Sequence, residues 1–293
     1  MTLRSLLFVP GDSERKLARS ESSSADALVL DLEDAVAADR TAVARTMVLE
    51  YLRAHRDRSK TRLWVRINPL STPKAIPDLA AIVAGAPDGI MLPKVTSASD
   101  VVTLDHFLSA LEARDGVDPE SIAIIPVATE APAAMFALGG FAGCSPRLSG
   151  MTWGAEDLAA AVGASTNRDA AGNLDFTYQL ARSLCLLAAV AADVQPIDTV
   201  SVNFRDADAL KKESETAHRA GFTGKIAIHP DQVDVINAAF TPSSDDVAYA
   251  NRVIDAFASG AGTVALDGKM LDMPHLKQAR RTLALAASLG SRS

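Results

Sequence analysis

The sequence predicts an α/β fold, a (β/α)₈ TIM barrel with a C-terminal helical extension. Strand-like apolar runs alternate with helix-like segments along the chain, as in parallel βα units. Five successive runs also end in polar or charged residues, and a barrel brings the C-terminal ends of its strands to one face. An enzyme is therefore our leading interpretation. The five runs are LVLDLED (28–34), LWVRIN (63–68), IMLPK (90–94), IIPVATE (124–130) and MTWGAED (151–157).

The candidate elements follow in the order that a barrel requires. Helical signals separate the strands: Asp12 or Ser13 can cap SERKLARS, Ser97 or Ser99 can cap a helix running to 113, and residues 177–192 keep an apolar face at helical spacing. A doubly wound open sheet fits the same alternation, but no GxGxxG follows the first strand, which disfavours a dinucleotide-binding version. The eight candidate strands are 5–10, 27–33, 62–68, 89–95, 122–129, 148–154, 198–204 and 225–230.

The pattern changes after the eighth strand. We expect a catalytic barrel over residues 1–235 and a helical extension or lid over 236–293. In the extension, helix-like stretches at 247–260 and 275–290 flank a Gly-rich connector, 260–274, which we expect to be a mobile loop. The extension must pack either on its own barrel or on a neighbouring subunit.

Composition bounds the possible partners. The chain has 293 residues with 48% hydrophobic side chains, enough for one barrel of ~250 residues and a short appendage. A formal net charge of -7 disfavours a nucleic-acid partner, which needs clustered Lys and Arg. The longest apolar run, 184–192, is far below the ~20 residues that span a bilayer. Two cysteines without metal-type spacing suit free thiols, and we expect a cytoplasmic protein without a membrane segment.

Two carboxylates at neighbouring strand ends are the foremost candidates for chemistry. Glu130 and Asp157 each follow a buried strand, the fifth and the sixth. Mg²⁺ suits such a pair, because it takes one or two protein carboxylates and fills its other positions with water and substrate oxygens. The alternative is that both residues only cap the helices that follow them.

Arg66 lies within the third strand, where alternation directs it away from Val65 and Ile67 and toward the barrel interior or mouth. Its guanidinium could bind a substrate carboxylate or a developing oxyanion, or could pair internally with an acid of the DLED segment, and both can hold together. Asp31, Glu33 and Asp34 crowd the end of the second strand, so at least one needs a cation such as Arg66 or Lys94.

His229 follows the eighth strand in IAIHP and could be a base, a metal ligand or a strand-end hydrogen bonder. Because no second histidine lies near it in the sequence, we expect a structural role. The sequence contains no HExxH, GxSxG elbow or P-loop.

The motifs together resemble one known family, the citrate lyase β-subunit-like (CitE-like) branch of the HpcH/HpaI aldolases. The resemblance extends over nearly the whole chain, and its last two motifs are most similar to citramalyl-CoA and malyl-CoA lyase-like members. Family members commonly carry Thr directly after the metal-binding Glu, whereas Ala131 stands here. The motifs are RSLLFVPG (4–11), LDLEDAV (30–36), VRIN (65–68), LPK (92–94), TE (129–130), WGAEDL (153–158), FRDADAL (204–210), GFTGKIAIHPDQ (221–232) and DGKMLDMPHLKQAR (267–280).

The resemblance implies a Mg²⁺-dependent acyl-CoA lyase that cleaves or forms a carbon–carbon bond of a 3-hydroxyacyl-CoA. Malyl-CoA or citramalyl-CoA would give an oxo acid, glyoxylate or pyruvate, and an acetyl-CoA-type thioester. It implies that Glu130 and Asp157 bind the metal and that Arg66 contacts the reacting oxygens. It further implies that Asp272 is an acid/base inserted into a neighbouring subunit's site, in a homotrimer or hexamer.

We expect Glu33, Asp34 and Lys94 to bind substrate together with Arg66. Two enzyme alternatives stay open: a malyl-CoA thioesterase, and a citrate lyase β subunit that acts on citryl-acyl carrier protein. A non-catalytic scaffold that binds CoA esters is the alternative from a different class.

Overall fold

The computed structural model describes residues 2–258, 260 and 262–290 and shows a parallel eight-stranded sheet closed into a barrel. The strand order is β5-β4-β3-β2-β1-β8-β7-β6. Parallel bridges from Ile124 to Leu148 and from Val127 to Thr152 join the two ends of this order. The predicted barrel is therefore confirmed. The strands are β1 Ser5–Pro10, β2 Ala27–Asp31, β3 Arg62–Arg66, β4 Gly89–Leu92, β5 Ala123–Pro126, β6 Gly150–Met151, β7 Gln195–Asp198 and β8 Gly224–Ala227.

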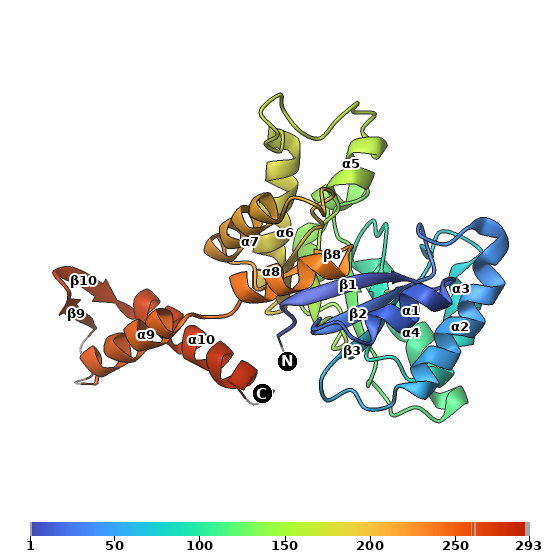
Figure 1. The fold of residues 1–293 in the computed structure, drawn as a ribbon, viewed down its shortest axis with the longest axis horizontal. Coiled ribbons are helices and arrows are strands. Elements are labelled where there is room, and N and C mark those ends of the chain that lie inside the picture. Colours follow the sequence, from blue (N-terminus) through green and yellow to red (C-terminus); the bar gives the residue numbers. More distant parts are fainter. Residues whose placement is uncertain (1, 259, 261, 291–293) are drawn as a thin grey trace.

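Helices cover the outside of the barrel (Figure 1). Their ends follow local capping chemistry: α4 begins in a capping box between Ser97 and Asp100 and stops where Gly116 takes a left-handed φ of 68°. Among the described helices, none combines the length and the apolar character needed to cross a bilayer. The helices of the barrel are α1 Glu14–Ser20, α2 Thr41–Ala54, α3 Ala75–Ile82, α4 Ala98–Asp115, α5 Ala155–Ala161, α6 Phe176–Ala191, α7 Ala207–Ala220 and α8 Val233–Ala239.

Strand alternation separates two buried layers. Leu6, Val29 and Trp64 belong to a cluster inside the barrel, whereas Leu30 and Val65 belong to the layer between strands and helices. Because successive side chains on a strand point to opposite faces, this alternation places Arg66 on the inner side, as predicted.

The seventh strand differs from the prediction. We predicted 198–204, but β7 ends at Asp198, and the segment after it is a loop in which Val202 and Phe204 are exposed. The strand ends there with the buried carboxylate of Asp198, which pairs with Lys225 and Arg182. The apolar residues that suggested a strand therefore lie on the surface.

The C-terminal extension forms a separate unit that projects away from the barrel (Figure 1). Helices α9 and α10 pack around their own small core, which includes Val253, Phe257 and Leu276. The boundary that we expected after residue 235 falls inside α8, whose Val233 and Ile236 pack in the barrel core. The elements of the extension are α9 Ser244–Ala256, β9 Thr263–Leu266, β10 Lys269–Asp272 and α10 Met273–Gly290.

The connector of the extension is not the mobile loop that we expected. From Thr263 to Asp272 it forms an antiparallel hairpin of β9 and β10. Asp267 and Gly268 occupy the turn with φ angles of 50° and 73°. Asp-Gly is a preferred pair for a two-residue hairpin turn, in which both residues need positive φ. The LDGK segment contains this turn signal, but the several glycines of the connector led us to expect a mobile loop.

Candidate active site

The predicted charged strand ends meet at one mouth of the barrel. A cavity of about 110 Å³ lies there, with Arg66, Glu130 and Asp157 in its wall. A volume of this size can hold several water molecules. The remaining lining residues are Phe8, Met91, Val127, Thr152, Trp153, Gly154, Ala155, Glu156, Thr199, Val200 and Ile226.

Arg66 is held from β2 by Asp31, its register partner on the neighbouring strand. Its Nε and Nη2 each donate to a different carboxylate oxygen of Asp31 at 2.7 Å. Its Nη1 lies 3.0 Å from Glu33 Oε2, and its Cζ lies 4.4 Å from the centre of the Phe8 ring. Burial by itself would lower the pKa of Arg66, but the carboxylates of Asp31 and Glu33 raise it above its ordinary value. Arg66 therefore pairs with acids of its own chain and also lines the cavity.

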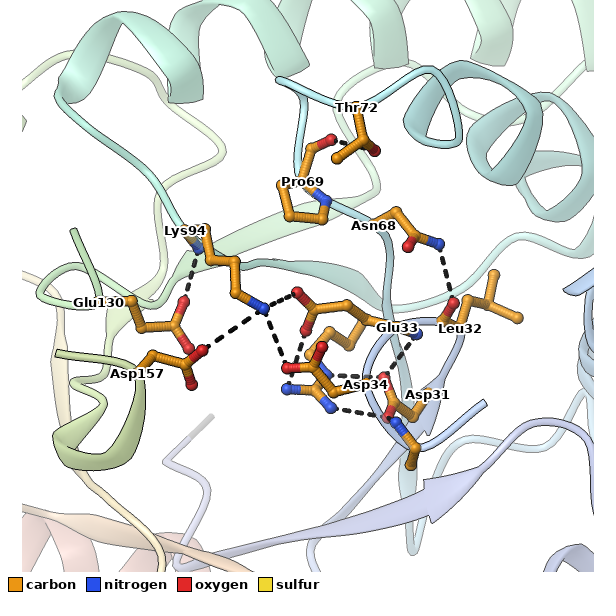
Figure 2. A network of polar contacts seen from close by, with 12 residues as sticks. Asp31, Leu32, Glu33, Asp34, Asn68, Pro69, Thr72, Lys94, Glu130 and Asp157 are labelled. Atoms are coloured by element: carbon orange, nitrogen blue, oxygen red, sulfur yellow. Dashed lines mark hydrogen bonds and ion pairs between the residues drawn. The ribbon is translucent and has the colours of Figure 1, made fainter. Parts of the chain in front are cut away.

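Lys94 forms the centre of a polar network that links the ends of β2, β4 and β5 (Figure 2). Its Nζ lies 2.5 Å from Glu33 Oε1, 2.9 Å from Asp34 Oδ2 and 3.5 Å from Asp157 Oδ1. Glu33 is buried and Asp34 is exposed. Burial raises the pKa of Glu33, although the charges of Arg66 and Lys94 partly oppose this.

Glu130 is positioned by backbone geometry on both sides. The backbone N–H of Lys94 donates to Glu130 Oε2 at 2.6 Å. On the other side, a Cβ at Gly154 would lie 2.7 Å from Glu130 Cγ, closer than real contacts allow. A larger residue would displace the Glu130 side chain, so glycine at this point, between β6 and α5, preserves the position of the carboxylate.

The ionised form of the Glu130 carboxyl group lacks sufficient counter-charge. Its side chain is only 6% exposed, and burial together with the charge of Asp157 raises its pKa to about 8. The Lys94 amide and ammonium oppose this shift without cancelling it. Asp157 lies in the first turn of α5 and is partly exposed. Two such carboxylates at one cavity form a site that a cation would stabilise.

The excess of acidic side chains around the cavity also favours binding of a cation. Five acidic side chains face two cations, Arg66 and Lys94, in this network. Within the described part of the chain, no group of three or more His, Cys, Asp or Glu side chains could hold a metal by itself. Glu130 and Asp157 offer two carboxylates to a divalent ion, and Mg²⁺ typically fills its other positions with substrate oxygens and water. The five acids are Asp31, Glu33, Asp34, Glu130 and Asp157.

One predicted site residue lies apart from the others. Asp272 ends β10 on the extension, which projects away from the barrel (Figure 1). Its Oδ1 lies 2.6 Å from His275 Nδ1, and half of its side chain is exposed. Within a single chain, Asp272 therefore does not reach Glu130, Asp157 or Arg66.

His229 has structural contacts, in agreement with our expectation. Its ring stacks on Phe204, with ring centres 4.7 Å apart, and its Nδ1 accepts the backbone N–H of Asp231 at 3.2 Å. Sequence reasoning missed two supporting residues of the site, Phe8 and Gly154. A signal existed for Gly154, because a glycine between a strand and the first turn of a helix often marks a close backbone approach.

Comparison with protein families gives two matches. Residues 4–230 match the family described as HpcH/HpaI aldolase/citrate lyase. Residues 175–291 match the family described as C-C bond lyase of the TIM-barrel fold. The first match covers the strand ends and every candidate site residue except Asp272, which lies in the second.

Three curated relatives align along almost the whole chain. A (3S)-malyl-CoA thioesterase of Cereibacter sphaeroides is 34% identical, covering 98% of this chain and 96% of that protein. The citrate lyase subunit beta of Haemophilus influenzae is 35% identical, covering 97% of each. The mitochondrial citramalyl-CoA lyase of Homo sapiens is 34% identical, covering 98% of this chain and 86% of that protein.

A solved structure agrees with these relatives. Protein CitE from Mycobacterium tuberculosis, in complex with magnesium, acetoacetate and coenzyme A, superposes with a TM-score of 0.78 at 33% sequence identity. The match covers 98% of both chains. The similarity therefore includes the extension as well as the barrel.

Proposed function

The chain belongs to the HpcH/HpaI aldolase/citrate lyase family, and from this premise we propose that it is a magnesium-dependent acyl-CoA lyase. It cleaves or forms a carbon–carbon bond of a 3-hydroxyacyl-CoA such as malyl-CoA or citramalyl-CoA. The products of cleavage are an oxo acid, glyoxylate or pyruvate, and an acetyl-CoA-type thioester. The observation that carries this proposal is the convergence of Glu130, Asp157 and Arg66 on one small cavity.

The metal assignment rests on the residues themselves. Glu130 and Asp157 offer hard oxygen ligands, and the raised pKa of Glu130 indicates that its charge lacks a sufficient counter-ion. When bound there, Mg²⁺ would act as a Lewis acid for the hydroxyl and carboxylate oxygens of the substrate. The related CitE structure contains magnesium, which supports the same metal.

Arg66 supplies a fixed positive charge at the reacting oxygens. Asp31 holds the guanidinium by two hydrogen bonds of 2.7 Å, so the group is already oriented before substrate enters. The hydroxyl proton first passes to solvent water and leaves negative charge on the oxygen. Cleavage of the carbon–carbon bond then makes this oxygen the carbonyl oxygen of the oxo acid and moves the electron pair of the broken bond to the thioester enolate. A preorganised cation at this oxygen stabilises the developing charge without rearrangement. Glu33 contacts both Arg66 and Lys94, and Lys94 also contacts Asp34, so these three residues support the guanidinium from the side.

Asp272 is our proposed acid/base, delivered from a second subunit. Cleavage leaves a thioester enolate, and Asp272 would donate a proton to its carbon; in the reverse direction it would take that proton back. The distance of the extension from its own barrel supports delivery to a neighbour (Figure 1).

We therefore propose a homotrimer or hexamer. One face of α6 carries four exposed apolar side chains, which supports burial against another subunit. They are Phe176, Leu180, Leu187 and Val190. We further propose a cytoplasmic location, since Cys144 and Cys185 are both free thiols, as is usual in a reducing compartment.

Thioester hydrolysis is the second candidate function. The relatives named (3S)-malyl-CoA thioesterase are as similar to this chain as the citramalyl-CoA lyase. Incubation with Mg²⁺ and malyl-, methylmalyl-, citramalyl- or citryl-CoA, followed by mass analysis, separates the two. A lyase releases an oxo acid and an acyl-CoA, whereas a thioesterase releases the intact hydroxy acid and free CoA. Citryl-acyl carrier protein serves as a further substrate for the citrate lyase alternative.

Two controls define the metal requirement. Removal of divalent ions with a chelator should abolish turnover, and Mg²⁺ should restore it. Glu130→Gln should bind Mg²⁺ too weakly for detection by calorimetry. If no CoA ester is consumed and the native protein binds no Mg²⁺, a CoA-ester-binding scaffold replaces the enzyme proposal.

A further inference from the structure

Lys94 has a set of contacts that a substrate anchor would not need. An ammonium group has three N–H donors. Here it faces three carboxylates, of Glu33, Asp34 and Asp157, at 2.5, 2.9 and 3.5 Å (Figure 2). Two of these contacts are hydrogen bonds, to Glu33 and Asp34, and the contact with Asp157 is an ion pair, so acids of the same chain already neutralise the ammonium that a substrate anion would need.

The backbone of Lys94 adds a second contribution. Its φ is 52°, in the left-handed region that side-chain-bearing residues rarely occupy. This conformation directs its N–H to Glu130 Oε2 at 2.6 Å. Such strain persists only where surrounding contacts fix it, and it concentrates at functional sites. A single residue therefore contacts both proposed metal ligands, one through its amide and the other through its ammonium.

We propose that the Lys94 ammonium acts as a stand-in cation, taking the place of the metal ion when none is bound. In this role it sets the affinity of the site for divalent ions. Its amide fixes Glu130, and its ammonium holds Asp157 in place when no metal is bound. A divalent ion at Glu130 and Asp157 is repelled by this ammonium, because like charges a few ångströms apart oppose each other. Glu33 and Asp34 remain as partners to which the ammonium can withdraw. This inference rests on the proposed function, because it assumes that Glu130 and Asp157 take a divalent ion.

The test is titration calorimetry of the full chain with Mg²⁺, and with Mn²⁺ as a second probe. Lys94→Met removes the charge and keeps most of the side-chain volume, while Lys60→Met removes the same charge from an exposed position. Lys94→Met should bind both ions about tenfold more tightly than the native protein. Lys60→Met should bind them with native affinity. Equal or weaker binding by Lys94→Met would overturn the stand-in role.

The backbone contribution is tested by comparing Lys94→Gly with Lys94→Ala. Both lack the ammonium and retain the amide, but glycine adopts positive φ freely and alanine does not. Lys94→Gly should therefore unfold at a higher urea concentration than Lys94→Ala, and equal midpoints would contradict the assigned backbone role.

Two further outcomes are decisive. If Lys94→Met fails to fold, Glu33→Gln combined with Lys94→Met also removes the charge of the buried acid that has lost its ammonium partner, and this double variant serves for the same titration. Native protein that binds neither ion would overturn this inference and the proposed function together. Native binding with unchanged affinity in Lys94→Met would overturn the role of Lys94 alone.

Discussion

Arg66 and Asp31 occupy the last paired positions of β3 and β2, and the guanidinium binds the carboxylate through two hydrogen bonds of 2.7 Å. The Asp31 side chain is 1% exposed and that of Arg66 13%. Asp31 also accepts the backbone N–H groups of Glu33 and Ala35, each at 3.0 Å. The pair therefore fixes both the Arg66 guanidinium and the turn that carries Glu33 and Asp34.

Breaking this pair from one side should destabilise the fold. Arg66→Met leaves the buried carboxylate of Asp31 without its cation, and we expect a loss of about 3 kcal/mol in the free energy of unfolding. Combining it with Asp31→Asn removes the orphaned charge and should recover more than half of this loss, while turnover stays abolished. Urea unfolding and an activity assay measure the two effects. Arg62→Met, which breaks a more exposed pair with Asp88, should change stability by less than about 1 kcal/mol.

A methyl group at Gly154 should disturb Glu130 more than it disturbs the fold. The new Cβ would lie 2.7 Å from Glu130 Cγ, so the carboxylate must move. We expect Gly154→Ala to weaken Mg²⁺ binding at least about tenfold and to destabilise the protein by roughly 1–3 kcal/mol. Gly139→Ala is the control, because a Cβ there meets no atom within 4 Å. Native Mg²⁺ affinity in Gly154→Ala would show that Glu130 does not depend on this close approach.

Asp198 should make stability depend on pH in the acid range. Burial by itself would raise the pKa of Asp198, but the charges of Lys225 and Arg182 lower it from 3.8 to about 2. A lowered folded-state pKa stabilises the protein above the unfolded value. That contribution, roughly 2 kcal/mol, fades as the pH falls from 3.8 toward 2.

Urea unfolding between pH 6 and pH 2 checks this contribution. The difference in stability between native protein and Asp198→Asn should be largest above pH 5 and should shrink below pH 4. Asp39→Asn, at an exposed position, should not show this trend. A difference that is constant with pH would exclude Asp198 as the titrating group.

Asp272 allows a test of shared sites between subunits. Asp272→Asn should abolish turnover and leave Mg²⁺ affinity unchanged, because the residue lies on the extension and not at the metal pair. Glu130→Gln should also be inactive, because it retains the acid/base but lacks a metal ligand. Co-expression of the two variants should restore part of the activity, since a mixed oligomer contains one intact barrel served by an intact extension. Activity no higher than that of either variant alone would contradict delivery from a neighbour.

Local sequence rules were sufficient for the main architecture. The alternation of apolar strands and amphipathic helices predicted the barrel, because parallel strands need crossover helices and bury both faces. The two errors have physical causes. The seventh strand was placed too late because exposed apolar residues followed Asp198, and the hairpin around Asp267 and Gly268 was missed because its glycines suggested a loop.

The order of residues along the chain is enough to bring Glu130, Asp157 and Arg66 to the barrel mouth, because the direction of parallel strands fixes where their C-terminal ends lie. The contacts that hold these side chains depend on the folded barrel. The amide of Lys94 on Glu130, the passage of Gly154 beside it and the pairing of Arg66 with Asp31 depend on register between strands. Register is set by packing across the whole barrel, so the local sequence around any one of these residues does not predict it.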